Sequence, residues 1–308
     1  MNKAISGIHH ITAMAGHPQP NIDFYAGVLG LRLVKLTVNY DDPGTYHLYY
    51  GDGVGSPGTI LTFFPWPNAL LGRPGAGQVT SIALAVTSGS LPHWQQRLRD
   101  AGFEVSGPVE RFGEQVLTTG DPDGLAVELV ETSAEGAPAV IGIHSAALTE
   151  WNLEPTSQLL TEVMGFRAAG VKGNRHRYLT GGGEASSTVD IVHQPDAARG
   201  RVSAGAVHHI AWRTPNDEEE LAWQRELMEL GYHVSPVMDR TYFHSIYYRE
   251  PGGVLFEIAT DGPGFAVDEP AETLGSKLVL PAWLEPRREA LEKRLPKVQL
   301  PDREVAVR

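Results

Sequence analysis

Two pairs of adjacent histidines stand in short apolar runs far apart in the chain. His9 and His10 lie in GIHHITAM, and His208 and His209 lie in GAVHHIAW. Apolar and β-branched surroundings predict strands, on which neighbouring side chains point to opposite faces. Only one histidine of each pair can therefore enter a shared site. Because imidazole nitrogen is a common metal ligand, we expect one histidine from each pair to bind a single ion.

A third ligand is expected at Glu257, in the run GGVLFEIAT. Its neighbours Phe256 and Ile258 point to the other face of the predicted strand. An ionised carboxylate on an apolar strand is costly unless it is paired or binds a metal. Two imidazoles and one carboxylate on one face are typical of non-haem Fe(II) enzymes that use O₂. Zinc, which prefers a tetrahedral site with one open position, is the alternative metal.

The chain repeats one unit four times: a strand, an amphipathic helix that ends at glycine, and further strands. The correspondence is clearest between GQVTSIAL and GAVHHIAW, between GIHSAALT and GIHHITAM, and between DPDGLAVELVE and EPGGVLFEIAT. The predicted helices cover residues 21–28, 90–101, 155–163 and 218–230, and Asn21 is the expected cap of the first. We therefore predict an α+β protein of four βαβββ modules that form two half-barrel domains.

Along the sequence, residues 1–136 hold the first pair of modules and residues 137–263 hold the second pair. Small residues and proline at 134–138 predict a linker between the pairs. Residues 264–308 form a tail with a charged helix at about 282–294.

The repeats show which histidines are special. At the position of His10 the third module has Ser145, and at the position of His209 the second module has Ser81. His9, in contrast, is matched by His144 in the third module, where no metal is expected. We therefore assign His10 and His209 as ligands and place the first histidine of each pair behind them.

Glu257 is weaker support, because Glu128 occupies the same place in the second module without matching histidines. That carboxylate is either a relic or the partner of a nearby cation. If His10, His209 and Glu257 share one ion, the first and fourth modules must form one half-barrel. The second and third modules must then form the other.

Further candidates precede Glu257 in the run DRTYFHSIYYRE. Arg240 could hold an anionic phenolate or carboxylate, or form a surface salt bridge. Tyr247 could donate a proton or hydrogen bond to substrate, or only pack in the core. Thr12 shares the strand face of His10, although threonine is also an ordinary strand former. The remaining histidines of these regions, His47 and His244, are expected at the surface.

The composition excludes several classes of protein. The 308 residues carry a net charge of -12 and no dense basic cluster, which disfavours nucleic-acid binding. The absence of cysteine excludes disulfides, thiolate metal sites and a cysteine nucleophile. No apolar run approaches the roughly 20 residues that span a bilayer, and the N-terminus lacks a signal-peptide core. The sequence predicts a cytoplasmic protein without membrane contact.

Five stretches resemble a known family: GIHHITAMAG, DFYAGVLGLRLVKLTVNYDDPGTYHLYYGD, GSPGTILTFFPW, GAVHHIAW and DRTYFHSIYYREPGGVLFEIATDGPGF. They are similar to the ring-cleaving dioxygenases of the vicinal oxygen chelate (glyoxalase/bleomycin-resistance/dioxygenase) superfamily, in the hydroquinone and chlorohydroquinone dioxygenase branch. The resemblance runs from about Gly7 to Phe265. It implies the four-module fold, the pairing of first and fourth modules, and Fe(II), with Mn(II) or another divalent metal as the alternative.

Carried over by position, the resemblance implies the metal ligands His10, His209 and Glu257, and the catalytic or substrate-binding residues His9, Thr12, His208, Arg240 and Tyr247. The expected reaction is O₂-dependent cleavage of a small aromatic para-diol, with both oxygen atoms inserted. A catechol extradiol dioxygenase or a glyoxalase-type metalloenzyme is the alternative within the superfamily. A metal-free protein that binds aromatic or drug-like ligands is the alternative from another class. A homo-oligomer is possible.

Overall fold

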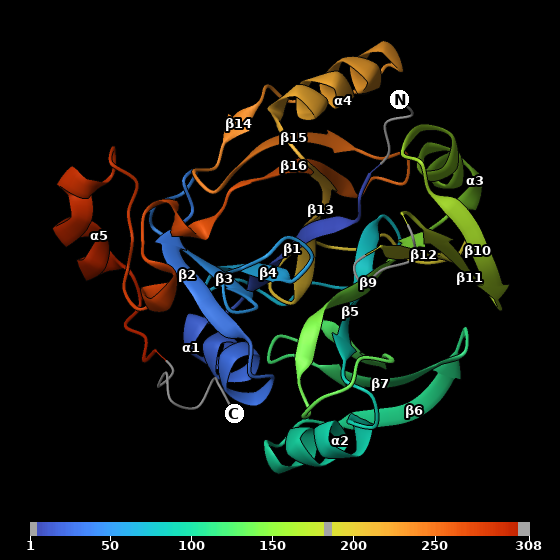
Figure 1. The fold of residues 1–308 in the computed structure, drawn as a ribbon, viewed down its shortest axis with the longest axis horizontal. Helices are drawn as coiled ribbons and strands as arrows, with labels where there is room; N and C mark the ends of the chain where they lie inside the picture. Colours follow the sequence, from blue (N-terminus) through green and yellow to red (C-terminus); the bar gives the residue numbers. More distant parts are fainter. Residues whose placement is uncertain (1–4, 182–186, 301–308) are drawn as a thin grey trace.

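The chain forms two eight-stranded half-barrel sheets in the computed structural model, which describes residues 5–181 and 187–300 (Figure 1). The first sheet contains, in spatial order, β14 (Met238–Asp239), β15 (Phe243–Arg249), β16 (Leu255–Pro263), β13 (Ala206–Thr214), β1 (Ile8–Ala15), β4 (Ile60–Pro65), β3 (Tyr46–Gly51) and β2 (Arg32–Val38). The second contains β10 (Arg167–Lys172), β11 (Arg175–Leu179), β12 (Thr188–His193), β9 (Val140–Glu150), β5 (Gln78–Val86), β8 (Ala126–Glu131), β7 (Glu114–Gly120) and β6 (Val105–Arg111). The predicted pairing of the first module with the fourth, and of the second with the third, is confirmed.

The strand that opens each module lies at the centre of its sheet. β1 and β13 are antiparallel, and their register sets Thr12 opposite His209 and His10 opposite Ala211. Every residue of β1 is buried, including its two histidines and Thr12. In the second sheet β9 and β5 pair in the same way, so that Ser81 lies opposite Ala147. The two sheets therefore offer matching positions that can be compared residue by residue.

Each module contributes one helical segment. These are α1 (Pro18–Ile22) with the π-helical η1 (Asp23–Val28), α2 (Leu91–Asp100), α3 (Leu153–Gln158) with the π-helical η2 (Leu159–Val163), and α4 (Asp217–Glu229). The predicted second and fourth helices match to within one residue at each end. The prediction for the first helix was wrong at its N-terminal end, because the helix begins at Pro18 and is capped by His17. Asn21 is buried inside the helix and accepts a hydrogen bond from the Tyr50 hydroxyl.

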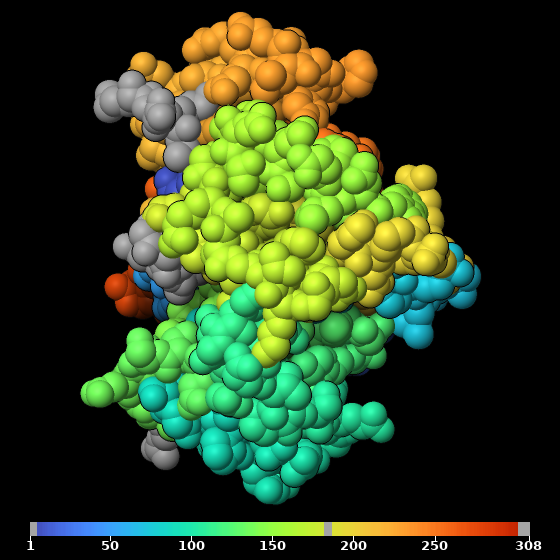
Figure 2. All heavy atoms as spheres, turned by 90° about the vertical axis from the view of Figure 1, so that its right-hand side faces the viewer, coloured from blue at the N-terminus to red at the C-terminus, as the bar shows by residue number. Residues whose placement is uncertain are grey.

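The chain crosses between the sheets twice, at residues 66–77 and 194–205. The two crossing segments lie side by side and are joined by bridges such as Leu71 with Ala204. Figure 2 shows them projecting together, in cyan and yellow, beside the face formed by the second and third modules. Residues 134–138, in contrast, join β8 to β9 within the second sheet. A domain boundary near residue 136 stays a prediction.

Two turns of related sequence lock the modules together. Asp121 accepts hydrogen bonds from the backbone of its own turn and from the Tyr25 hydroxyl of η1. Glu250 does the same in the fourth module, with the Thr156 hydroxyl of α3 as its partner. Each carboxylate thus binds its turn to a helix of the neighbouring module.

The surroundings of the two turns differ at Glu150, the last residue of β9. By strand register, Glu150 occupies the position that Ala15 has on β1. Glu150 is buried, and neither of its carboxylate oxygens has a hydrogen-bond partner among the described residues. Burial and the nearby Glu250 raise the pKa of Glu150. A Cβ on Gly252 would lie 1.7 Å from Oε2 of Glu150, so only glycine fits against this carboxyl group.

The tail covers the outer edge of the first sheet, next to β2 (Figure 1). It holds the short helices η3 (Phe265–Val267), η4 (Ala271–Thr273) and η5 (Glu285–Arg287), followed by α5 (Arg288–Arg294). The predicted helix at 282–294 was too long, because Pro286 keeps the preceding turn out of the α-helix. Lys35 of β2 is fully buried, 2.6 Å from Asp268 of the tail. None of the described helices is long and apolar enough to span a membrane.

Candidate metal centre

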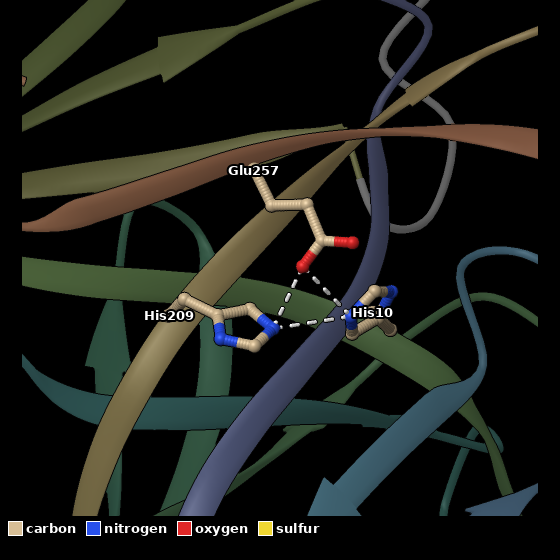
Figure 3. A group of neighbouring side chains, drawn as sticks. All are labelled: His10, His209 and Glu257. Atoms are coloured by element: carbon tan, nitrogen blue, oxygen red, sulfur yellow. Dashed lines mark hydrogen bonds and ion pairs between the residues drawn. The ribbon is translucent and has the colours of Figure 1, made fainter. Parts of the chain in front are cut away.

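His10, His209 and Glu257 converge on one point at the centre of the first sheet (Figure 3). His209 Nε2 lies 2.8 Å from Glu257 Oε2, and His10 Nε2 lies 3.4 Å from the same oxygen. The two Nε2 atoms are 3.3 Å apart. All three side chains are buried, and they come from β1, β13 and β16. The two central strands bring together histidines that are 199 residues apart in sequence.

The arrangement fits a divalent metal ion. Oε1 of Glu257 accepts a hydrogen bond from the Ser245 hydroxyl, whereas Oε2 is buried and accepts no hydrogen bond from the residues that the structure describes. Burial alone would raise the pKa of Glu257, but the imidazoles of His10 and His209 outweigh it and hold the pKa well below its usual value. An ionised oxygen without a hydrogen bond, facing two imidazole nitrogens, is the donor set of a two-histidine, one-carboxylate metal site.

The first histidine of each pair lies behind the second. His9 Nδ1 is 2.9 Å from His10 Nδ1, and His208 Nδ1 is 2.7 Å from His209 Nδ1. Burial lowers the pKa of both His9 and His208 to about 3, so both rings are neutral. If His10 and His209 bind a metal through Nε2, their Nδ1 atoms carry the ring hydrogen. Each then donates this hydrogen to Nδ1 of the preceding histidine. His208 then carries its own hydrogen on Nε2.

A cavity of about 340 Å³ opens beside the three ligands. Four of the residues predicted to act in catalysis or substrate binding line it: Thr12, His208, Arg240 and Tyr247. His9 does not line it and instead packs against His10 and the ring of Phe243. The other lining residues are mainly aromatic or polar: Asn39, Tyr40, Asp41, His47, Tyr49, Phe64, Trp66, Phe243 and Leu255, together with the two histidine ligands.

Arg240 and Tyr247 form one unit in the cavity wall. Arg240 Nε donates to the Tyr247 hydroxyl at 3.2 Å, and another guanidinium nitrogen lies 3.3 Å from Asp41. Burial raises the pKa of Tyr247 far above its usual value, so its phenol stays neutral. Burial would lower the pKa of Arg240, but Tyr247 and Asp41 raise it, and the guanidinium stays charged. The Tyr247 ring also lies 5.8 Å from the His209 ring.

Two residues of the site were missed from the sequence. His47 was expected at the surface, but it is half-buried in the cavity wall, where its Nε2 bonds to the Thr62 hydroxyl at 2.8 Å. Ser245 orients Glu257 from the neighbouring strand. The available signal was alternation, because His47 shares a strand face with the buried Tyr49. His244 is partly exposed and pairs with Asp217 at 2.7 Å.

The second half-barrel holds ion pairs in place of metal ligands. Glu128, the counterpart of Glu257, pairs with Arg111 at 2.6 Å. This contact resolves the role of Glu128 in favour of pairing with a cation. Ser145, in the place of His10, bonds to the ring of His144, which in turn bonds to Glu114.

Comparison with known proteins gives the same family for most of the chain. A family model described as Glyoxalase/Bleomycin resistance protein/Dioxygenase superfamily matches residues 7–129 and 142–258. MhqO of Bacillus subtilis (strain 168), provisionally named a ring-cleaving dioxygenase, is 49% identical over 96% of this chain and 97% of its own. The chlorohydroquinone/hydroquinone 1,2-dioxygenase of Sphingobium indicum (strain UT26S) is 36% identical over 91% of this chain and 93% of its own.

Solved structures agree. The crystal structure of a provisionally named dioxygenase from Bacillus subtilis has a TM-score of 0.93 and 47% identity, and covers 97% of this chain and 99% of that chain. Glyoxalase I from Zea mays has a TM-score of 0.66 at 14% identity over 83% of this chain and 92% of that chain, which shows a shared fold alone. The chain belongs to the glyoxalase, bleomycin-resistance protein and dioxygenase superfamily.

Proposed function

We propose that the protein is an Fe(II)-dependent ring-cleaving dioxygenase that inserts both atoms of O₂ into a hydroquinone-type substrate. The observation that carries this proposal is the meeting of His10, His209 and Glu257 beside an aromatic-lined cavity. The ligand set suits Fe(II), and the cavity suits a single aromatic ring. The names of the relatives at 49% and 36% identity support the same reaction class.

An Fe(II) ion held by His10, His209 and Glu257 would supply the Lewis acidity and the redox chemistry that O₂ activation requires. Metal binding requires neutral histidines and an ionised carboxylate. The two imidazoles hold the pKa of Glu257 well below its usual value, so this carboxylate is ionised. Burial lowers the pKa of His209. The hydrogen bond from Ser245 fixes the rotation of the Glu257 carboxylate.

Arg240 and Tyr247 are suited to hold the substrate oxygen nearest the metal ligands as a phenolate. The Tyr247 oxygen accepts a hydrogen bond from Arg240, so its own hydrogen is available for the substrate. The permanent charge of Arg240 favours the anion and strengthens the Tyr247 hydroxyl as a donor. His208, with its hydrogen on Nε2, is a further donor in the same wall.

The aromatic side chains of the cavity wall are suited to orient the substrate ring. Phe243 packs 5.0 Å from the His10 ring, and Phe64 lies 5.9 Å from the His208 ring, so aromatic rings flank one candidate ligand and one neighbouring histidine. A flat aromatic substrate is held in such a slot by ring contacts at low entropic cost. Orientation within the slot, with one oxygen at the metal end, contributes to rate through proximity.

The test is anaerobic reconstitution with Fe(II), followed by measurement of O₂ uptake with hydroquinone and with catechol. We expect one iron per chain and O₂ uptake with hydroquinone in preference to catechol. Cleavage of catechol alone would replace the proposal with an extradiol dioxygenase. Isomerase activity on thiohemiacetals without O₂ uptake would indicate a glyoxalase-type enzyme, and failure to bind iron would indicate a metal-free binding protein.

A further inference from the structure

A chain of hydrogen-bonded polar groups leads from Thr12, beside the candidate metal ligands, into the far wall of the cavity. Thr12 lies opposite His209 in the strand register, on the neighbouring strand. Its hydroxyl lies 2.8 Å from the hydroxyl of Thr62 on β4, and Thr62 lies 2.8 Å from Nε2 of His47 on β3. The chain therefore crosses three adjacent strands and ends at an imidazole ring that lines the cavity.

The His47 ring is held in a fixed position. Its centroid lies 3.9 Å from the Tyr49 ring and 4.3 Å from the Phe64 ring, and Nε2 is engaged by Thr62. Among the described residues, no hydrogen bond to Nδ1 of His47 is found. A polar atom between aromatic rings is left unpaired when substrate displaces water, unless the substrate bonds to it.

His47 also stands on the opposite side of the cavity from Arg240 and Tyr247. Tyr247 is on β15, beyond the strand that carries Glu257, whereas His47 is on β3, two strands beyond β1. Two strand spacings amount to about 10 Å across the sheet. A ring whose first oxygen lies between the metal ligands and Tyr247 therefore presents its far end to His47.

The second half-barrel provides an internal comparison. By strand register, the places of Thr12, Thr62 and His47 are taken there by Ala147, Asp190 and Arg175. Arg175 and Asp190 pair with each other at 3.0 Å. The half-barrel with the metal ligands thus carries a neutral hydrogen-bonding chain where its partner carries a closed ion pair.

We propose that His47, positioned by Thr62 and Thr12, binds the second oxygen of a para-diol and thereby selects para-diols over ortho-diols. This inference rests on the proposed function. The two oxygens of a para-diol lie at opposite ends of the ring, so one reaches the metal end and the other reaches His47. The oxygens of an ortho-diol lie side by side and leave His47 without a partner.

The hydroxyls of Thr62 and Thr12 let the imidazole take either role. If His47 donates from Nε2 to Thr62, then Nδ1 is an acceptor for the substrate hydroxyl hydrogen. If Thr62 donates to Nε2, then Nδ1 carries a hydrogen and donates to the substrate oxygen. Both arrangements bind an oxygen substituent, and neither binds a ring that has only carbon and hydrogen at that end.

The test measures binding of hydroquinone and of phenol to the Fe(II)-loaded protein without O₂, by calorimetry. Phenol keeps the first hydroxyl and lacks the second. In the wild type we expect hydroquinone to bind about 10-fold more tightly than phenol, which is the value of one hydrogen bond. In His47→Phe the two ligands should bind equally, whereas His47→Gln should recover part of the difference. Thr62→Val should give an intermediate loss.

The matched control is His176→Phe on β11 of the other sheet, which should leave both affinities and iron content unchanged. With O₂ present, His47→Phe should raise KM for hydroquinone and leave the value for catechol unchanged. If the wild type cleaves hydroquinone but His47→Phe, with full iron content, weakens phenol and hydroquinone binding equally, the inference is overturned. If the wild type consumes no O₂ with hydroquinone, the proposed function itself fails, whatever the variant does.

Discussion

Glu257 in the first half-barrel faces two imidazole nitrogens, whereas Glu128, at the same place in the second, faces Arg111 at 2.6 Å. The arginines also correspond, because Arg111 and Arg240 each precede the strand that faces the glutamate. Arg240, however, contacts Tyr247 and Asp41 and leaves Glu257 to the histidines. The same module therefore forms either a closed ion pair or a carboxylate with one oxygen available to a metal.

The contrast extends through the rest of the second half-barrel. Arg177 bonds to Asp190 and to Glu114, and its guanidinium lies 4.2 Å from the centroid of the Phe112 ring. At the place of Arg177 the first sheet has Tyr49, a neutral cavity residue. Buried charges must be paired, so Arg177 is neutralised by two carboxylates, whereas the neutral Tyr49 needs no partner charge.

The largest effect is expected at the two glutamates themselves. Glu257→Gln removes the anionic ligand and should lower iron occupancy and O₂ uptake at least about 100-fold. Glu128→Gln should retain full iron content. Iron is measured after anaerobic reconstitution and gel filtration. Equal iron content in the two variants would show that Glu257 contributes no more to iron binding than Glu128 does.

A large loss of stability is expected in the second half-barrel from Arg177→Met. This change leaves Asp190 and Glu114 without a principal partner and should lower the free energy of unfolding by about 3 kcal/mol, measured in urea. The matched change in the first sheet, Tyr49→Phe, should cost under about 1 kcal/mol. Similar losses in both variants would contradict the ion-pair interpretation.

Ser245→Val sharpens the comparison, because Val116 occupies the same register position in the second sheet. Loss of the hydrogen bond to Glu257 should weaken Fe(II) binding by about 10- to 100-fold, measured by competition with a chelator. The urea midpoint should change little. An unchanged iron affinity would show that packing alone orients the carboxylate.

The smallest effect is expected at Glu150, which lies next to Glu250 of the fourth-module turn and occupies the position of Ala15 in the first module. Because its pKa is raised, its contribution to stability is full at pH values below the ordinary carboxyl pKa and is lost as the pH rises through the raised value. Glu150→Gln should therefore be about 1 kcal/mol more stable than the wild type at about pH 9, with no gain at about pH 5. Parallel pH profiles of thermal unfolding would contradict this assignment.

The sequence allowed prediction that His10 and His209 meet, and hence of the module pairing, because the repeat places serine at their positions in the sister modules. Glu257 lacked this mark, because Glu128 occupies its place in the second module. Residue type at matched positions carried that prediction. His47 and Ser245 have no such marker, since their partners Thr62 and Glu257 are set by strand register. The start of the first helix could not be predicted either, because Asn21 is of a residue type that often caps helices. It is instead buried and bonded to Tyr50.

The two crossings of the chain between sheets affect how the protein is made. The second and third modules are consecutive, so their sheet can close as soon as they leave the ribosome. The first module must wait, with the edge of β1 unpaired, until a strand 199 residues away from His10 has been synthesised. An unpaired apolar edge is a site of aggregation, so slow translation of the fourth module should be harmful. The three candidate metal ligands, in turn, meet only after β16, which carries Glu257, has been synthesised.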